Sequence, residues 1–203
     1  MKEKLSKDKF DTECWANDNI RDPYQVIAEL FSASDMFHLN NTIKKLMECC
    51  ISPKMYQCKP PADVLLYSRI IHSAIKAADV LKEKQSSEII IYENDLLNNK
   101  YFISHRVLHD DWTDFPRFLS RKEYCNPYLA FRKFFKYQSL DTWLTIWKNI
   151  VDGALCPEEA RFSINELSVY IHLIKLVEAA HLIDVRETVH VRGRLKKRTV
   201  EGC

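Results

Sequence analysis

The chain has 203 residues, of which 46% are hydrophobic and 29% are charged, and its formal net charge is +2. This composition is typical of one sizeable globular domain or of two small ones that pack tightly. Only three glycines are present. Sandwiches, dinucleotide-binding folds and phosphate-binding loops use glycine at positions of positive φ, so its scarcity argues against them and favours helices. The small net charge argues against a general polyanion partner.

The cysteines indicate a reducing environment. There are seven, an odd number, and no Cys-x-x-Cys pair is present, which favours free thiols in the cytoplasm over a disulfide framework. Residues 1–11 are charged throughout and lack the apolar segment of a secretory signal. No apolar run approaches the roughly 18 residues that a membrane span needs. We therefore expect a cytoplasmic protein with no membrane partner.

Residues 1–21 are expected to form a charged arm, and residues 22–85 a first helical unit. Asp22 is a suitable helix cap, and Pro23 suits the first helical position, where its missing N–H costs nothing. Apolar residues at three- and four-residue steps predict three helices in this unit. They are a short helix that begins at Pro23, a second helix of about 15 residues that ends before Pro53, and a long helix over residues 62–84.

The segment 22–53 aligns without a gap on the segment 126–157. At a constant separation of 104 residues the alignment pairs Pro23 with Pro127, Tyr24 with Tyr128, Phe31 with Phe135, Lys44 with Lys148 and Pro53 with Pro157. Their apolar positions agree as well. The pattern predicts an internal repeat with a pseudo-twofold plan. Two amphipathic helices in the same order would also align their apolar residues without any duplication, so this alternative stays open.

The linker between the two units, residues 86–125, has the weakest pattern. Its apolar runs at 89–92 and 101–103 are compatible with two short strands or with one irregular helix, because runs this short show no decisive period. The aromatic residues Trp112, Phe115 and Phe118 are expected to clamp the linker to the body of the protein.

The second unit, residues 126–184, is expected to contain the same three kinds of helix. Asn126, followed by a proline, repeats the start signal of the first unit, and Ser163 with Glu166 suggests a capping box for a long helix over residues 163–182. We expect the two units to pack through their long helices, because these have the widest apolar stripes.

Three residues of the linker, His105, His109 and Asp110, form the best candidate metal site. On a helix the two histidines would share one face at a spacing of four residues, with a carboxylate beside them, as ligands of zinc or iron do. The glutamate of the zinc-protease motif is missing, and a solvated polar linker explains the same residues.

Glu178 and His181 form a Glu-x-x-His pair, which di-iron bundles use on two facing helices. In the long helices the Ala77-Ala78 and Ala179-Ala180 pairs suggest a separation of 102 residues, two having been lost in the connection. At that separation the matching residues of the first unit are Lys76 and Asp79, so the pair fails the symmetry that such a site requires. A histidine in the core or at a helix end is the favoured interpretation.

The cysteines at helix ends, Cys49, Cys50 and Cys156, favour burial as small apolar residues. Neither a Gly-x-Ser-x-Gly elbow nor a signature of a cysteine nucleophile accompanies them. A redox-sensing thiol is the alternative, with Cys58 and Cys203 as its candidates.

The second unit is rich in aromatic residues, which are Tyr128, Phe131, Phe134, Phe135, Tyr137, Trp143 and Trp147. Their spacing is that of helix faces that pack in a core. A partner groove lined by five of them, Tyr128, Phe131, Phe135, Trp143 and Trp147, is the functional alternative, and it requires several of these rings to be exposed together.

The tail, residues 185–203, is strongly basic, and its five candidates for phosphate contacts are Arg192, Arg194, Lys196, Lys197 and Arg198. Such contacts would make nucleic-acid binding weaken steeply with salt. A charged terminus that only aids solubility is the alternative. Val189, Val191 and Leu195 alternate around Gly193, which also permits a short strand there.

The sequence thus predicts an all-α bundle of about six main helices in two pseudo-equivalent halves. The leading functional hypothesis is a non-enzymatic helical module that binds a protein partner or a second copy of itself. Nucleic-acid binding through the tail is the first alternative, and a metal-dependent hydrolase at His105, His109 and Asp110 is the second. No cofactor is predicted.

Overall fold

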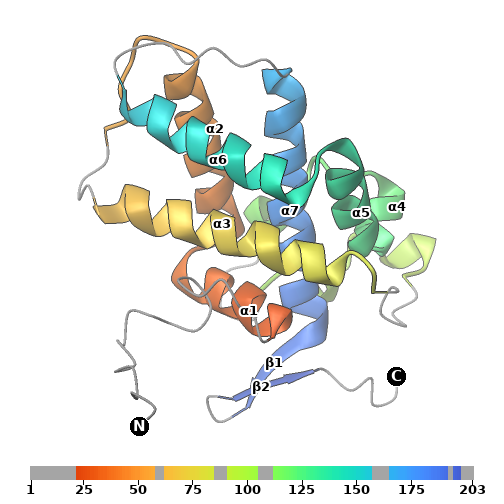
Figure 1. The fold of residues 1–203 in the computed structure, drawn as a ribbon. Coiled ribbons are helices and arrows are strands. Elements are labelled where there is room, and N and C mark those ends of the chain that lie inside the picture. Colours follow the sequence, from red (N-terminus) through yellow and green to blue (C-terminus); the bar gives the residue numbers. More distant parts are fainter. Residues whose placement is uncertain are drawn as a thin grey trace, which may run out of the picture.

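The computed structural model describes residues 22–57, 62–84, 91–104, 112–156, 165–191 and 194–197. Within these ranges the chain is predominantly helical (Figure 1). The α-helices are α1 (Pro23–Ala33), α2 (Met36–Cys50), α3 (Ala62–Leu81), α4 (Arg121–Cys125), α5 (Tyr128–Tyr137), α6 (Leu140–Leu155) and α7 (Glu166–Glu187). Short 3-10 helices are η1 (Glu93–Asp95), η2 (Asn99–Tyr101) and η3 (Trp112–Asp114), and the strands are β1 (Thr188–Val191) and β2 (Arg194–Lys197). The prediction of a helical bundle is confirmed.

Side-chain caps fix the starts of the first two helices. Asp22 accepts a hydrogen bond from the backbone N–H of Tyr24 at 3.0 Å, and Pro23 occupies the first turn of α1, as predicted. Asp35 caps α2 by accepting from the backbone N–H of His38. Each cap satisfies an N–H group that has no partner inside its helix.

The predicted start signals of the second unit are wrong. Asn126 ends α4 and does not cap α5, which begins at Tyr128. The cap of α7 is Asn165, whose Oδ1 accepts from the backbone N–H of Ser168 at 2.9 Å. Ser163, the predicted cap, lies outside the described residues. Asparagine and serine are both good caps, so composition alone does not choose between them.

The main core lies between the six longer helices, and α7 runs through it. α7 contacts α1, α2, α3 and α5, while the most extensive helix pair is α2 with α6. The long helices α3 and α7 contact each other, as predicted, but the most extensive contact between the two units does not involve them. The apolar residues of α3 and α7 are distributed over contacts with several neighbouring helices. None of the helices in the described part of the chain is long and apolar enough to cross a membrane.

A second, smaller core joins the linker to α7. Its buried members are Phe102, Tyr124 and Leu182, and Phe115 packs against them. The ring of Phe115 meets the ring of Phe102 edge-on at 5.0 Å, and Trp112 stacks on Phe102 and contacts Phe115, each at 5.7 Å. The described linker residues form 3-10 turns, irregular segments and helix α4, and 101–103 is not a strand.

The chain leaves the bundle through a hairpin at the end of α7. β1 and β2 pair antiparallel, with Val191 opposite Arg194 and Thr188 opposite Lys197. This agrees with the strand that the alternation around Gly193 permits. α7 continues to Glu187, so Arg186 lies in a buried helical turn and does not belong to a basic tail.

Candidate functional site

The second half of α7 carries charged side chains that are buried. Glu178 is 1% exposed, and its carboxylate receives three backbone N–H groups of the linker. Oε1 accepts from Arg117 at 2.8 Å, and Oε2 accepts from Phe118 at 2.9 Å and from Leu119 at 3.1 Å. Burial raises the pKa of Glu178, while the three N–H groups oppose that rise. The carboxylate therefore fastens the turn 117–119 to α7.

His181 lies one turn further along α7 and is 2% exposed. Its Nε2 is 2.7 Å from the carbonyl oxygen of Phe102, so Nε2 carries the proton and donates to it. Nδ1 has no hydrogen-bond partner. Burial lowers the pKa of His181, although the carboxylates of Asp114 and Asp184 act in the opposite direction. This neutral histidine is the core residue that the sequence favours.

Arg186 makes the third attachment. Its Nε donates to the carbonyl oxygen of Tyr101 at 2.8 Å, its Nη1 donates to the carbonyl oxygen of Tyr124, and its guanidinium lies 4.5 Å from the Tyr124 ring centre. Burial lowers the pKa of Arg186. Glu178, His181 and Arg186 thus bind backbone groups of the linker at residues 117–119, at residues 101 and 102, and at residue 124. Their role is structural.

A pocket of about 150 Å³ lies where this linker crosses α2 and α7. We call it the α2/α7 pocket; its lining includes Phe37, Asn40, Asn41 and Lys44 of α2, Tyr170 and Glu178 of α7, and Phe115, Arg117 and Phe118 of the linker. Phe37 is 53% exposed and Phe118 is 41% exposed. The ring of Phe118 meets that of Tyr170 edge-on at 6.1 Å. The pocket therefore presents two accessible aromatic rings, one from a helix and one from a turn that Glu178 fixes.

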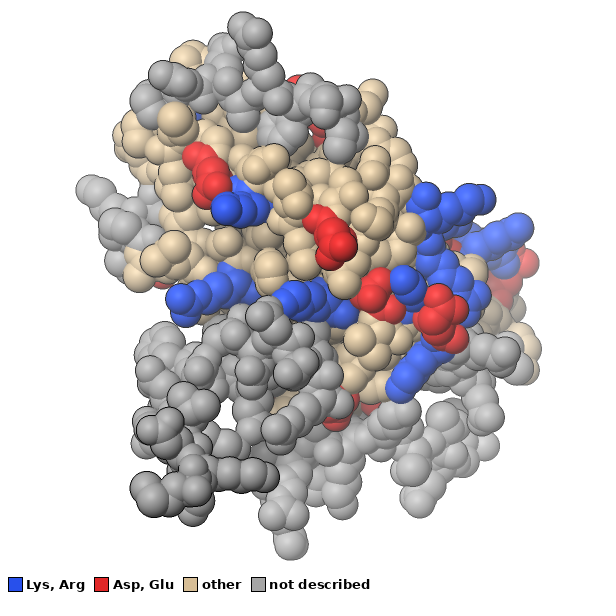
Figure 2. All heavy atoms as spheres, viewed as in Figure 1, with Lys and Arg blue, Asp and Glu red and all other residues tan. Residues whose placement is uncertain are grey.

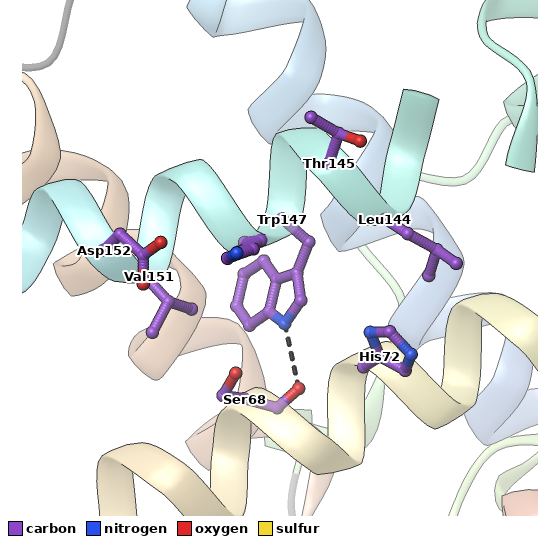
Figure 3. A pocket seen from close by; sticks show the side chains of 8 residues that line it. Ser68, His72, Leu144, Thr145, Trp147, Val151 and Asp152 are labelled. Carbon is purple, nitrogen blue, oxygen red and sulfur yellow. Dashed lines mark hydrogen bonds between the residues drawn. The ribbon is translucent and has the colours of Figure 1, made fainter. Parts of the chain in front are cut away.

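A larger pocket of about 310 Å³ lies between α3 and α6 (Figure 3). We call it the α3/α6 pocket; it is lined by Ser68, His72, Leu144, Thr145, Trp147, Lys148, Val151 and Asp152. The indole of Trp147 reaches from α6 toward α3, and its Nε1 donates to the carbonyl oxygen of Ser68 at 2.9 Å. Lys148 and Asp152 are exposed one turn apart on α6.

The predicted partner-groove residues lie in the core. Tyr128, Phe131, Trp143 and Trp147 are buried, and Phe135 is partly buried against them. Phe134 stacks on Trp143 at 3.9 Å, and the indole N–H of Trp143 donates to the carbonyl oxygen of Phe134. The core-packing interpretation of this spacing therefore holds. Phe37 and Phe118, which line the α2/α7 pocket, are exposed, and the sequence did not single them out for a partner groove.

The metal candidates His105, His109 and Asp110 lie outside the described residues. Among the residues that are described, no group of three or more His, Cys, Asp or Glu side chains is arranged to hold a metal ion.

The described cysteines have different environments. Cys50 is buried, its Sγ donates to the carbonyl oxygen of Asn149, and burial raises its pKa to about 11. Cys49 is partly buried, and burial raises its pKa as well. Cys156 is exposed at the end of α6, so the prediction of burial is wrong for it, because the chain leaves the helix there. The alternative candidates Cys58 and Cys203 lie outside the described residues.

Basic side chains gather on part of the surface. In Figure 2 they form a row along α3 and a cluster on the side where Figure 1 places α5. Arg132, Lys133 and Lys136 are exposed on α5. Of the tail candidates, Arg194, Lys196 and Lys197 belong to β2, whereas Arg192 and Arg198 lie outside the described residues.

No protein-family model, no curated protein and no solved structure matches this chain. The functional argument therefore rests on the geometry of its own residues.

Proposed function

We propose that the chain is a non-enzymatic helical interaction module that binds a partner protein at the α2/α7 pocket. The observation that carries this proposal is that Phe37 and Phe118 are both exposed and line the same pocket. Lys44 and Arg117 line the same pocket. Aromatic rings and arginine are the residue types on which protein interfaces concentrate their binding energy.

The size of the pocket supports a protein partner over a metabolite. Ligand sites usually enclose about 300–1,000 Å³, whereas this pocket has about 150 Å³. That volume suits one or two side chains inserted from a partner surface.

The fixed backbone of the turn 117–119 supports the same function. Three N–H groups of this turn are bound by the buried carboxylate of Glu178, so Phe118 is presented from an ordered backbone. An interface that is ordered before binding loses less conformational entropy when the complex forms.

We further propose that the two halves are a duplicated unit, so that the α3/α6 pocket is the counterpart of the α2/α7 pocket. Several relations support this. α2 and α6 begin 104 residues apart, as do α3 and α7. α2 packs on α7 as α6 packs on α3, and α1 packs on α7 as α5 packs on α3. Asn40, Asn41 and Lys44 line one pocket, and the residues 104 positions later, Leu144, Thr145 and Lys148, line the other.

The test is to place a photo-crosslinking amino acid, p-benzoylphenylalanine, at Phe37 and, as a control, at Leu65, which is 61% exposed on α3. A partner identified from position 37 alone is then purified. We expect Phe37→Ala and Phe118→Ala each to weaken its binding at least tenfold and Leu65→Ala to leave it unchanged.

Sedimentation velocity of the purified chain adds a second arm. A dimer that Phe37→Ala disrupts would identify the partner as a second copy of this chain. Equal binding by wild type, Phe37→Ala and Phe118→Ala would exclude the α2/α7 pocket as the interface.

Nucleic-acid binding is the second candidate, and the observation that favours it is that Arg194, Lys196 and Lys197 belong to a paired strand. Exposed basic residues on α5 add to the same charge. The test compares the full chain with a chain that ends at Val191, which keeps the buried Arg186. Loss of RNA or DNA binding and of its salt dependence would support this role; unchanged binding would exclude the tail.

A further inference from the structure

The α2/α7 and α3/α6 pockets differ in what lies beside them. Linker residues 113–118 form one side of the α2/α7 pocket. In the sequence they precede α4 and α5. Among the described residues, those that line the α3/α6 pocket all belong to its two helices. In the described part of the chain, no third segment lines the α3/α6 pocket as the linker lines the α2/α7 pocket.

The duplicated plan identifies the chain segment that would occupy this position. Residues 112–119 lie immediately before α4 and α5, and the residues 104 positions earlier are Asp8–Trp15. The described chain begins at Asp22, so this segment lies outside it.

The chain length permits the arrangement. Phe118 lines the α2/α7 pocket ten residues before Tyr128, whose hydroxyl lies 2.9 Å from that of Tyr24. Cys14 is likewise ten residues before Tyr24. Tyr24 and Tyr128 are in contact, so the two stretches of chain start from the same place. Ten residues lead from Tyr128 back to the α2/α7 pocket, and ten residues before Tyr24 are equally available to reach the α3/α6 pocket.

The charges of one face of α3 and of the segment Asp8–Trp15 are complementary. Arg69, His72 and Lys76 follow one another at three- and four-residue steps along α3, so they share one face of this helix. On α6 the exposed Lys148 and Asp152 both line the pocket, so the basic character lies on the α3 side. The segment Asp8–Trp15 carries three acidic residues and one lysine, together with Phe10 and Trp15.

We propose that the α3/α6 pocket is an intramolecular docking groove for Asp8–Trp15. Its aromatic residues enter the pocket outside the buried Trp147, and its carboxylates face the basic residues of α3. This inference rests on the duplicated plan proposed above but not on the identity of any partner at the α2/α7 pocket.

The experiment uses the full chain with p-benzoylphenylalanine in place of either Lys148 or Lys44, which line the α3/α6 and α2/α7 pockets and lie 104 residues apart. The protein is irradiated at low concentration, and the crosslinked peptides of the monomer band are mapped by mass spectrometry. Position 44 is the internal control and should crosslink to residues 113–118. Position 148 should crosslink to Asp8–Trp15.

Substitutions then test the chemistry of the contact. The double variant Phe10→Ala with Trp15→Ala should lower the crosslink yield from position 148 at least fivefold and leave that from position 44 unchanged. Far-UV circular dichroism and the melting temperature establish that the variant stays folded.

Two results would overturn the proposal. One is a crosslink from position 44 to the linker without any crosslink from position 148 to Asp8–Trp15. The other is a crosslink to this segment only in the dimer band, which would assign the groove to a second copy. Neither result affects the crosslinking test at Phe37. Docking of Asp8–Trp15 in the α3/α6 pocket and partner binding at the α2/α7 pocket can therefore be refuted independently.

Discussion

The hydroxyl groups of Tyr24 and Tyr128 lie 2.9 Å apart, and Tyr128 donates its proton to Oε2 of Glu187 at 2.6 Å. Since a hydroxyl has one proton, Tyr24 must donate to Tyr128, which gives a chain from Tyr24 through Tyr128 to Glu187. Both tyrosines are buried. Burial and the bond to Glu187 raise the pKa of Tyr128 far above its usual range, so the phenol stays protonated.

This chain predicts an order of stabilities. Tyr128→Phe removes the bond to a carboxylate and the acceptor of Tyr24, so it should lower the free energy of unfolding by about 1.5–3 kcal/mol. Tyr24→Phe removes one neutral bond and should cost about 0.5–1.5 kcal/mol. Urea unfolding measures both, with Tyr92→Phe, at a residue that is 68% exposed, as the control that should show no change. A larger loss for Tyr24→Phe would contradict the assigned direction of donation.

Replacing Glu178 by glutamine should destabilise the protein by about 2–3 kcal/mol, because an amide N–H₂ would face backbone donors and leave at least one of them unpaired. Hydrogen exchange should show the loss of protection at the amides of residues 117–119. The matched control is Glu48→Gln, at a side chain that is 60% exposed, and it should be neutral. Equal effects of the two substitutions would show that Glu178 does not hold the turn.

Glu123 should make stability depend on acid pH. Burial alone would raise its pKa, but hydrogen bonds from Lys133, from the backbone of Ser120 and from Lys175 outweigh it and lower the pKa to about 2. A depressed carboxyl pKa stabilises the fold above the unfolded value of about 4.5, and this stability is lost as pH falls from there to about 2. After allowance for screening at the exposed Lys133, the loss is about 2 kcal/mol.

Urea unfolding of wild type and Glu123→Gln between pH 5 and about 2.5 would measure this contribution. The variant should be less stable at pH 5 and should approach the wild type at the acid end. Parallel pH profiles would contradict the depressed pKa.

His181 should make stability depend on pH near neutrality. Because the pKa of His181 is lowered in the folded state, the unfolded chain binds a proton at a pH where the folded chain does not. The free energy of unfolding therefore falls as pH drops below about 6.5, by at most about 1.4 kcal/mol per pH unit. His181→Gln keeps a donor for the carbonyl of Phe102 and does not titrate. The difference in unfolding free energy between wild type and this variant should therefore change between pH 7 and pH 5. Asp114, Asp184 and Arg186 surround the site and are unchanged in the comparison.

The hypothesis of a metal-dependent hydrolase at His105, His109 and Asp110 has a direct test. Protein purified without a histidine tag should contain less than one tenth of an equivalent of zinc or iron by elemental analysis if the interaction module is correct. One equivalent that is lost in the double variant His105→Ala with His109→Ala would instead support the metal site.

The periodicity of apolar residues was sufficient to locate α1, α2 and α3, because a 3.6-residue repeat and the Asp22 cap are local properties of the chain. For the same reason, the spacing of Trp143 and Trp147 indicated core packing. The separation of 104 residues also came from the sequence, and the starts of α2 and α6 repeat it.

Tertiary structure decided the rest. The role of Glu178 depends on backbone N–H groups about 60 residues away, and that of Arg186 depends on the carbonyl groups of Tyr101 and Tyr124. Every residue except proline has the same backbone donor and acceptor, so no side-chain pattern identifies such partners. Only the folded chain brings Phe37 and Phe118 to the same pocket, because a surface shared by a helix and a distant turn has no period in the sequence.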